Sequence, residues 1–428
     1  MSTNNNYIYR LTLFAVFLFI LSALFYCYAY FAQVFPSVIT NQLMIKFSTD
    51  AVGLSMLSSS FFWSYTIMQI PSGLLIDKFG ARKTLTIAIF ISAVGVLLFS
   101  ITNLFYLAIL GRILMGIGCA FSFVGVLYLL IRWFPAKKLA LFIGFLQLLA
   151  SLGAIGGGAA LSFFLTKFNW QIVIAIFAIL GFILALLILI FIKNRPFQLR
   201  ITTKSKEPST FESLKTIFTN AQTWYIAIYS FLIWGPILTF ASMWGIPCLR
   251  NAYNLSKVDA ASLMALVWIG IAIGSPLAGW ISDLIHKRCI VLSVSALLGL
   301  LSTLSILYIP STSIYLLIVL LFLFGIGASG QTLIFAVVKE NNHRSTSGAA
   351  NGFNNMAVVM GGAVLIPLVG YLLNINWTGA INNGVRYYSG NDYQAALIVL
   401  PACFLIALIL SMFFIKETNC KPIFNKKD

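Results

Sequence analysis

Charged residues are scarce in this chain. Asp, Glu, Lys and Arg make up 9% of its 428 residues, against about 25% in an ordinary soluble domain. A soluble chain of this length would form roughly three domains, and so few charges could not cover their surfaces. Hydrophobic residues reach 60%. The composition therefore excludes a soluble enzyme and a disordered chain, and it predicts a membrane protein with several spanning helices.

The cysteines show no spacing typical of a metal site or a disulfide framework. None of the six forms a CxxC pair, and most lie in apolar runs. We expect them to pack as small buried hydrophobic residues. We also expect no metal and no cofactor.

A basic face of the kind that binds nucleic acid is missing as well. The net charge is +17, but Lys and Arg sit in short clusters between long apolar runs. In those positions they cannot line one face of a soluble helix. We therefore expect no nucleic-acid partner.

Long apolar runs are what the sequence has in abundance. A spanning helix needs about 20 largely apolar residues, and charges, Pro, Gly and Asn separate twelve such runs. The first carries no charge for 35 residues, whereas the apolar core of a signal peptide has about 7–15, so we expect it to be retained. The predicted helices are 11–41, 51–76, 82–102, 104–132, 138–165, 170–193, 222–248, 258–283, 288–309, 313–338, 346–373 and 393–416.

Lys and Arg are distributed unequally over the loops between these helices. With the N-terminus placed in the cytoplasm, cytoplasmic segments hold 21 of them, the opposite loops hold 5, and Arg112 lies inside a span. Because cytoplasmic loops carry the excess of Lys and Arg, we expect both termini in the cytoplasm. The longest cytoplasmic loop, 194–221, then links an N-terminal six-helix bundle (1–193) to a C-terminal one (222–428).

The two halves of the chain repeat one another at a nearly constant offset. Two six-helix halves related by a pseudo-two-fold axis along the membrane normal are typical of transporters, with the substrate between the halves. The repeated positions are Gly73 and Asp77 with Gly279 and Asp283 (offset 206), Gly116 with Gly325 (209), Gly144 and Gly153 with Gly352 and Gly361 (208), and Asp50 with Asp259 (209).

The loop after the second predicted helix carries the motif G-x-x-x-D-[RK]-x-G-x-[RK]-[RK] without a mismatch, and its copy after the eighth is degenerate. Arg112 with Gly116 and Gly118 forms a second motif. These motifs resemble those of the major facilitator superfamily, over about residues 8–418. The resemblance implies an all-α membrane protein, with twelve transmembrane helices in two pseudo-symmetric bundles, that acts as a secondary transporter and not as an enzyme.

The resemblance also implies a role for the loop motif as a conformational latch. In the family this contact holds one half against the other in the outward-open state, and Asp77 would accept a hydrogen bond or lie near a helix N-terminus. The alternative is that the loop charges only set the topology. The expected latch residues are Gly73, Asp77, Gly80, Arg82, Lys83 and Asp283.

Arg112 is the one charged residue well inside a predicted span. A charge inside the membrane is costly and should face a cavity or a partner. One hypothesis makes it an anchor for a carboxylate or other anion, or a relay in state switching. The other makes it a structural arginine bonded to backbone carbonyls of the first or fifth helix.

Polar and aromatic residues supply the expected substrate pocket, because the resemblance places their helices around the central cavity. Tyr26, Tyr30 and Gln33 share one face of the first helix at i, i+4 and i+7. Lipid-facing or core packing is the alternative for each single aromatic residue. The candidate substrate-binding residues are Arg112, Tyr26, Tyr30, Gln33, Gln147, Tyr229, Trp234, Gln331, Asn354 and Asn355, and Trp63, Tyr65 and Gln69 are weaker candidates.

Acidic residues and histidines are missing from the interior of the predicted spans. All ten acids lie at helix ends or in loops, and both histidines lie in loops predicted to be cytoplasmic. Proton-coupled transporters usually place such a group in the cavity. The sequence therefore favours uniport or exchange, while coupling to a cation through amide and carbonyl oxygens stays open.

These patterns predict a secondary transporter that moves an amino acid, a short peptide or an organic anion by alternating access. The alternative is a proton- or cation-coupled symporter of organic anions or sugars. A non-transporting receptor or a membrane-embedded enzyme would need a sensory domain or a catalytic constellation. The expected partners are a small-molecule substrate and the lipid bilayer, and we expect a monomer. Short tails and heavy use of Ile, Asn and Lys favour the bacterial inner membrane.

The loop motif yields a first test. We expect Asp77→Asn to leave membrane insertion intact but to reduce transport severalfold, because the neutral amide loses the charge that the latch requires. Uptake is measured at matched surface expression. Unchanged uptake kinetics would show that the loop charges only set topology.

Overall fold

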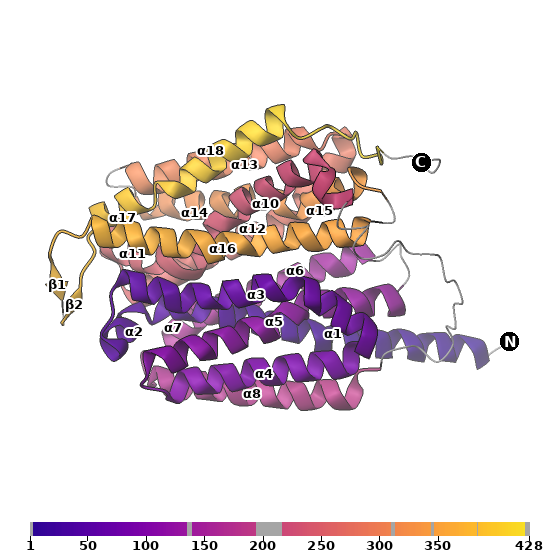
Figure 1. Cartoon of the computed structure of the whole chain (residues 1–428), viewed down its shortest axis with the longest axis horizontal. Coiled ribbons are helices and arrows are strands. Elements are labelled where there is room, and N and C mark those ends of the chain that lie inside the picture. Colours follow the sequence, from indigo (N-terminus) through magenta and orange to yellow (C-terminus); the bar gives the residue numbers. More distant parts are fainter. Residues whose placement is uncertain are drawn as a thin grey trace.

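The computed structural model describes residues 3–134, 139–193, 216–309, 313–343, 346–382 and 384–423, with side chains from residue 13 onward except 139–141. Its helices form two bundles that lie side by side (Figure 1). The start of α1 and the last described residues lie at the same end, opposite the β1–β2 hairpin. We call the end with the chain termini inner and the hairpin end outer, following the predicted orientation.

The N-terminal bundle follows the first six predicted spans, except that the first one, 11–41, divides at Phe35 and continues through a short 3-10 turn and a separate helix to Phe47. Its third and fourth helices are joined through Gly80, whose φ of 80° is a conformation that glycine adopts readily. The elements are α1 (Thr3–Val34), η1 (Phe35–Val38), α2 (Thr40–Phe47), α3 (Ala51–Phe79), α4 (Ala81–Ile101), α5 (Phe105–Trp133), α6 (Leu139–Ile155), η3 (Gly156–Ala160), α7 (Leu161–Phe164) and α8 (Trp170–Phe191).

The C-terminal bundle departs from the predicted spans in three places. The tenth span breaks at Ser329 into two helices, a short hairpin precedes the last span, and that span divides near Leu397. The elements are α10 (Ala221–Thr239), η4 (Phe240–Trp244), α11 (Gly245–Tyr253), α12 (Lys257–Ile285), α13 (Cys289–Tyr308), α14 (Ile314–Ala328), α15 (Gly330–Glu340), α16 (Ser347–Ile375), β1 (Ile381–Asn382), β2 (Val385–Arg386), α17 (Gly390–Ala396) and α18 (Val399–Phe413).

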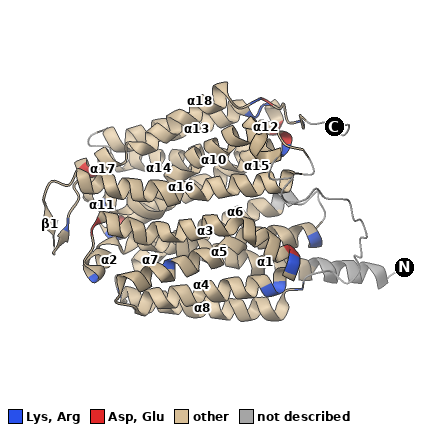
Figure 2. Ribbon diagram, in the orientation of Figure 1, with Lys and Arg blue, Asp and Glu red and all other residues tan. Residues whose placement is uncertain are grey.

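The all-α, two-bundle fold is confirmed. Within the described residues, eleven helical segments are long and apolar enough to cross a membrane. The remaining predicted span, α3, is 29 residues long but rich in serine, and its serine hydroxyls mostly bond to carbonyls of its own preceding turn. Charged residues lie mostly near the two ends of the bundles (Figure 2). Of the predicted linker 194–221, residues 194–215 lie outside the described part.

The outer ends of the two bundles are joined. The carboxylate of Asp50 caps α3 by accepting from the N–H groups of Val52 and Gly53, and it pairs with Arg386 of the hairpin at 3.4 Å. The Tyr388 hydroxyl accepts a hydrogen bond from the Ala51 N–H at 3.1 Å. Nearby, η1 packs against η4 and α11. These contacts close the outer side.

The Asp50–Arg386 pair yields a test of this closure. We expect Arg386→Ala to favour opening toward the outer side by up to about fivefold, because a partly exposed ion pair contributes roughly 0.2–1 kcal/mol. The measurement is labelling of a cysteine introduced at Ala29, in a variant whose six native cysteines are replaced, by an impermeant thiol reagent added outside. Lys167→Ala, in another predicted outer loop, is the control. Equal labelling in both variants would show that the Asp50–Arg386 pair does not hold the outer side closed.

Candidate functional site

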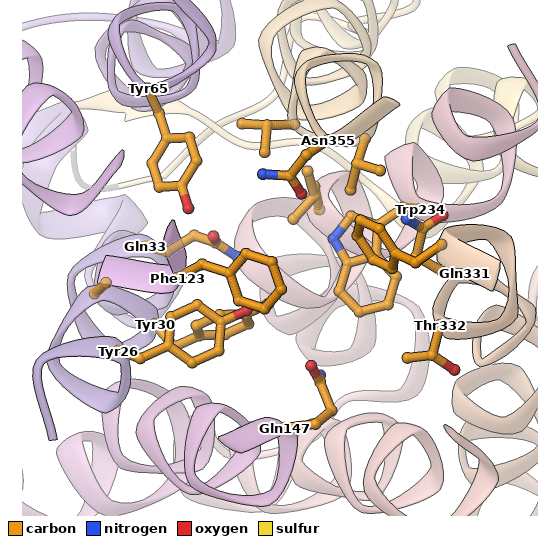
Figure 3. A pocket seen from close by; sticks show the side chains of 15 residues that line it. Tyr26, Tyr30, Gln33, Tyr65, Phe123, Gln147, Trp234, Gln331, Thr332 and Asn355 are labelled. Carbon is orange, nitrogen blue, oxygen red and sulfur yellow. The ribbon is translucent and has the colours of Figure 1, made fainter. Parts of the chain in front are cut away.

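A cavity of about 70 Å³ lies between the two bundles. This is the volume that the centre of a water molecule can reach. A buried water needs about 10–15 Å³ of it, so roughly five waters fit. Figure 3 shows the labelled side chains arranged around it. The lining residues are Tyr26, Ala29, Tyr30, Gln33, Tyr65, Phe123, Gln147, Trp234, Leu238, Gln331, Thr332, Phe335, Asn355, Val358 and Val359.

Many lining residues occupy equivalent positions in the two halves of the internal repeat, 208 residues apart. Adding 208 to a lining position in the N-terminal half gives a lining position in the C-terminal half four times. Because both halves present the same positions, the cavity lies about the pseudo-two-fold axis. The pairs are Tyr26 with Trp234, Tyr30 with Leu238, Phe123 with Gln331, and Gln147 with Asn355.

Two close helix–helix contacts position one of these pairs, Gln147 and Asn355. A Cβ added to Gly153 of α6 would lie 2.1 Å from the Cys27 carbonyl oxygen of α1. A Cβ added to Gly361 of α16 would lie 2.5 Å from the Gly235 Cα of α10. Cys27 and Gly235 are themselves 208 apart, so the two contacts are copies. Only glycine permits them, and they bring Gln147 and Asn355 to the cavity.

The N-terminal wall of the cavity is aromatic. The rings of Tyr26 and Tyr30 meet edge to face at 5.0 Å, and the Tyr26 and Phe123 rings are 5.6 Å apart. Phe123 also meets Phe335 of the other half at 6.1 Å. Such pairs stabilise beyond the area that they bury. They therefore hold a preformed aromatic surface against which a ligand can pack.

The amide side chains around the cavity are only partly hydrogen-bonded. Gln33 donates to Ser242 at 3.1 Å, and Asn355 donates to Gln69 at 2.6 Å, and both bonds join the two halves. Gln331 is 4% exposed, yet neither its nitrogen nor its oxygen has a partner among the described residues. The Gln147 nitrogen is also buried and unpaired within the described part of the chain. Because these amides also border the cavity, water or a ligand in it can supply the missing partners.

The lining carries no charged side chain among the described residues. Arg112 is 0% exposed and lies outside the lining. Its guanidinium donates to the Ala32 carbonyl at 2.6 Å and to the Ser58 carbonyl at 3.4 Å, and it lies 4.7 Å from the centroid of the Phe61 ring. In this conformation it ties α5 to α1 and α3. The structural hypothesis expected backbone carbonyls of the first or fifth predicted helix to accept these hydrogen bonds. The observed carbonyls belong to the first and the second predicted helix.

Two other predicted site residues lie apart from the cavity. The Tyr229 hydroxyl is buried and donates to the Leu292 carbonyl at 2.8 Å. The Asn354 oxygen accepts from Ser230 at 2.7 Å, while its nitrogen is buried and has no partner among the described residues. Seven of the ten predicted residues line the cavity, and Arg112, Tyr229 and Asn354 do not.

Sequence reasoning missed several lining residues. Phe123 and Leu238 look like ordinary apolar residues of a span. The repeat offset points to both, because Phe123 lies 208 before Gln331 and Leu238 lies 208 after Tyr30. Thr332 and Phe335 follow Gln331 on α15, and no separate pattern in the sequence points to them.

The expected latch residues lie at the inner ends of α3, α4 and α12. Asp77 is exposed, and no described residue of the other half bonds to it. Arg82 donates to the Leu189 carbonyl at 2.6 Å, within its own half. A Cβ atom added to Gly73 would have no neighbouring atom within 4 Å, so no other helix approaches closely at this glycine. The latch stays a prediction that concerns another conformation, since the bundles here are joined at the outer side and the cavity.

Asp283, the copy of Asp77, is engaged within the C-terminal half. It pairs with Arg288 at 2.7 Å, and Arg288 also pairs with Glu340 at 2.8 Å. Burial alone would lower the pKa of Arg288, but the hydrogen bonds to these carboxylates raise that pKa above its usual value. The cluster joins the inner ends of α12, α13 and α15.

Comparisons with known proteins agree with this architecture. The profile of the Major Facilitator Superfamily matches residues 13–247 and again 237–426. The Hexuronate transporter of Bacillus subtilis (strain 168) is 25% identical over 373 residues, covering 82% of this chain and 86% of its own. The Probable galactarate/D-glucarate transporter GudP of the same organism is 24% identical over 404 residues, covering 85% and 86%.

Two solved structures share the fold. The inward-facing, unoccupied bacterial homolog of the human lysosomal transporter Spinster gives a TM-score of 0.76 at 15% identity, covering 93% of this chain and 96% of that one. A point mutant of the nucleoside transporter NupG gives a TM-score of 0.74 at 17% identity, covering 94% and 100%.

The placement of Arg112 yields a test. We expect Arg112→Gln to slow transport of acids and of neutral substrates by the same factor, about tenfold or more, because a lost charged hydrogen bond costs roughly 1.5–3 kcal/mol. Arg112→Lys keeps the charge but not the planar fork, and should fall between. The measurement is uptake of an acid and of its amide. A selective loss of the acid would restore the anion-anchor hypothesis.

Proposed function

The chain belongs to the major facilitator superfamily, and we propose that it carries a small polar metabolite through the central cavity by alternating access, as a uniporter or an exchanger. The observation that carries this proposal is a preformed cavity on the pseudo-two-fold axis whose walls come from both halves. In such an architecture a rocking of one half against the other exposes the same site to each side in turn.

The cross-half contacts support a closed outer side in the present conformation. The Asp50–Arg386 pair and the Tyr388 contact lie outside the cavity, and the Gln33–Ser242 bond joins the halves on its outer flank. The solvated latch carboxylate of Asp77 lies at the opposite end. A substrate would therefore exchange with the inner side in this state, and opening to the outside would require these contacts to break.

The lining chemistry supports transport without proton coupling. No described lining residue is Asp, Glu, His, Lys or Arg, so no described side chain in the cavity wall would gain or lose a proton near neutral pH. A proton-coupled carrier needs such a group where the substrate binds. Uniport or exchange needs none.

A second candidate is a coupled symporter of organic anions. Its support is that relatives of this chain are named for hexuronate and for galactarate or D-glucarate, and that Arg112 lies buried between α5 and α1. For this function the guanidinium would have to turn toward the cavity when the outer side opens. The bacterial relatives also support a bacterial plasma membrane as the location.

Transport assays in proteoliposomes separate the two candidates. For uniport or exchange we expect substrate flux to change less than about twofold between pH 6 and pH 8, because the described lining has no group with a pKa in that range. A pH-sensitive dye inside the vesicles should record no proton movement with the substrate. Proton flux at a fixed ratio to substrate would contradict uniport and favour the symporter.

A further inference from the structure

We propose that the cavity selects an uncharged, compact polyhydroxylated ring, of which a hexose is the simplest case, over the corresponding sugar acid. This inference rests on the transport function proposed above and names the substrate class of that site. Gln331 is assigned as the residue that hydrogen-bonds the ring hydroxyls, and the aromatic wall as the surface on which the ring packs.

The lack of a matching charge argues against an anionic substrate. All described lining residues are neutral, and the Arg112 guanidinium lies outside the lining, where it donates to the Ala32 and Ser58 carbonyls and leaves its Nε unpaired among the described residues. A carboxylate that leaves water for a buried site needs an opposite charge or several hydrogen bonds to offset its desolvation. A zwitterionic amino acid would bring two such charges. A neutral ring brings none.

Gln331 supplies the positive evidence. Its side chain is 4% exposed, borders the cavity, and has both polar atoms unpaired among the described residues. One amide can donate through nitrogen and accept through oxygen, and a hydroxyl can do both in return. Two adjacent hydroxyls on a ring therefore give each polar atom of Gln331 a partner, whereas a carboxylate can only accept and leaves the Gln331 oxygen unpaired.

The two walls of the cavity differ in a way that fits a sugar ring. Phe123 in the N-terminal half occupies the position of Gln331 in the C-terminal half, 208 residues later. Tyr26, Tyr30 and Phe123 form the aromatic wall, and Gln331, Thr332 and Trp234 lie across the cavity, with the amides of Gln147 and Asn355 between the two groups (Figure 3). A hexose has an apolar C–H face and a rim of hydroxyls. Its face would pack on the rings while its rim reaches the amides.

The size of the cavity sets a limit on the substrate. Space for roughly five waters matches a compact molecule whose oxygens take the places of those waters. Five waters take up about 150 Å³ of liquid volume, which suits a compact ring but is far too little for a long peptide. Displaced water leaves amides that a ligand must satisfy again, so hydroxyl groups are the appropriate replacement.

The test uses the purified full-length chain in proteoliposomes and two matched pairs, D-glucose with D-glucuronate and D-galactose with D-galacturonate. Within a pair the ring is shared and C6 carries either a hydroxyl or a carboxylate. We expect at least one hexose to be transported with an apparent affinity at least tenfold higher than that of its acid. Equal or better transport of the acids would overturn the inference and leave the transporter function intact. Flux of amino acids or dipeptides without flux of either hexose would also overturn the inference, and absence of flux with every one of these compounds would instead contradict the proposed function.

Variants of Gln331 sharpen the test. Gln331→Leu should weaken hexose binding about ten- to a hundredfold, because the hydroxyls lose both partners. Gln331→Lys should shift the hexose-to-acid ratio toward the acid, a change that a structural role would not produce. Gln171→Leu, a glutamine at the start of α8 outside the cavity, is the matched control and should leave both substrates unchanged. A ratio that Gln331→Lys does not move would overturn the assignment of Gln331.

Discussion

The cavity depends on a backbone contact that occurs twice. At Gly153, α6 approaches α1 so closely that a Cβ would collide with a carbonyl oxygen, and at Gly361 α16 approaches α10 in the same way. In a membrane, helices gain little from burying apolar surface against each other, so close packing at small residues holds them together. The two contacts fix where Gln147 and Asn355 point, and with them the two sides of the site. A larger residue at either glycine would separate the helices and widen the cavity.

Much of the fold could be predicted because its causes lie in composition and period. The apolar runs are long enough to span a bilayer, and the fixed offset between Gly153 and Gly361 identifies the two halves. The break at Ser329 and the hairpin before the last span were not predicted, although the sequence carries a signal for each. Gly327 and Gly330 flank the break, and Asn383-Gly384 between the two short strands is typical of a hairpin turn.

The candidate site could be predicted only where polarity was unusual. Gln33, Gln147, Gln331 and Asn355 stand out because amides are costly in a span, and all four border the cavity. Arg112 stood out for the same reason, yet its partners are backbone carbonyls. Sequence shows that a polar group needs a partner but not which atoms supply it. Aromatic residues such as Phe123 carry no such signal, because an aromatic ring is equally at home in lipid, in a core or against a ligand.

The difference between Phe123 and Gln331 has a geometric consequence. In a site with true two-fold symmetry, a molecule and the same molecule turned by 180° about the axis would bind equally well. A phenyl ring facing the position of an amide removes that equivalence, so one orientation is preferred. A bound molecule then meets the two halves with chemically different edges, and it keeps one orientation relative to them as the halves move.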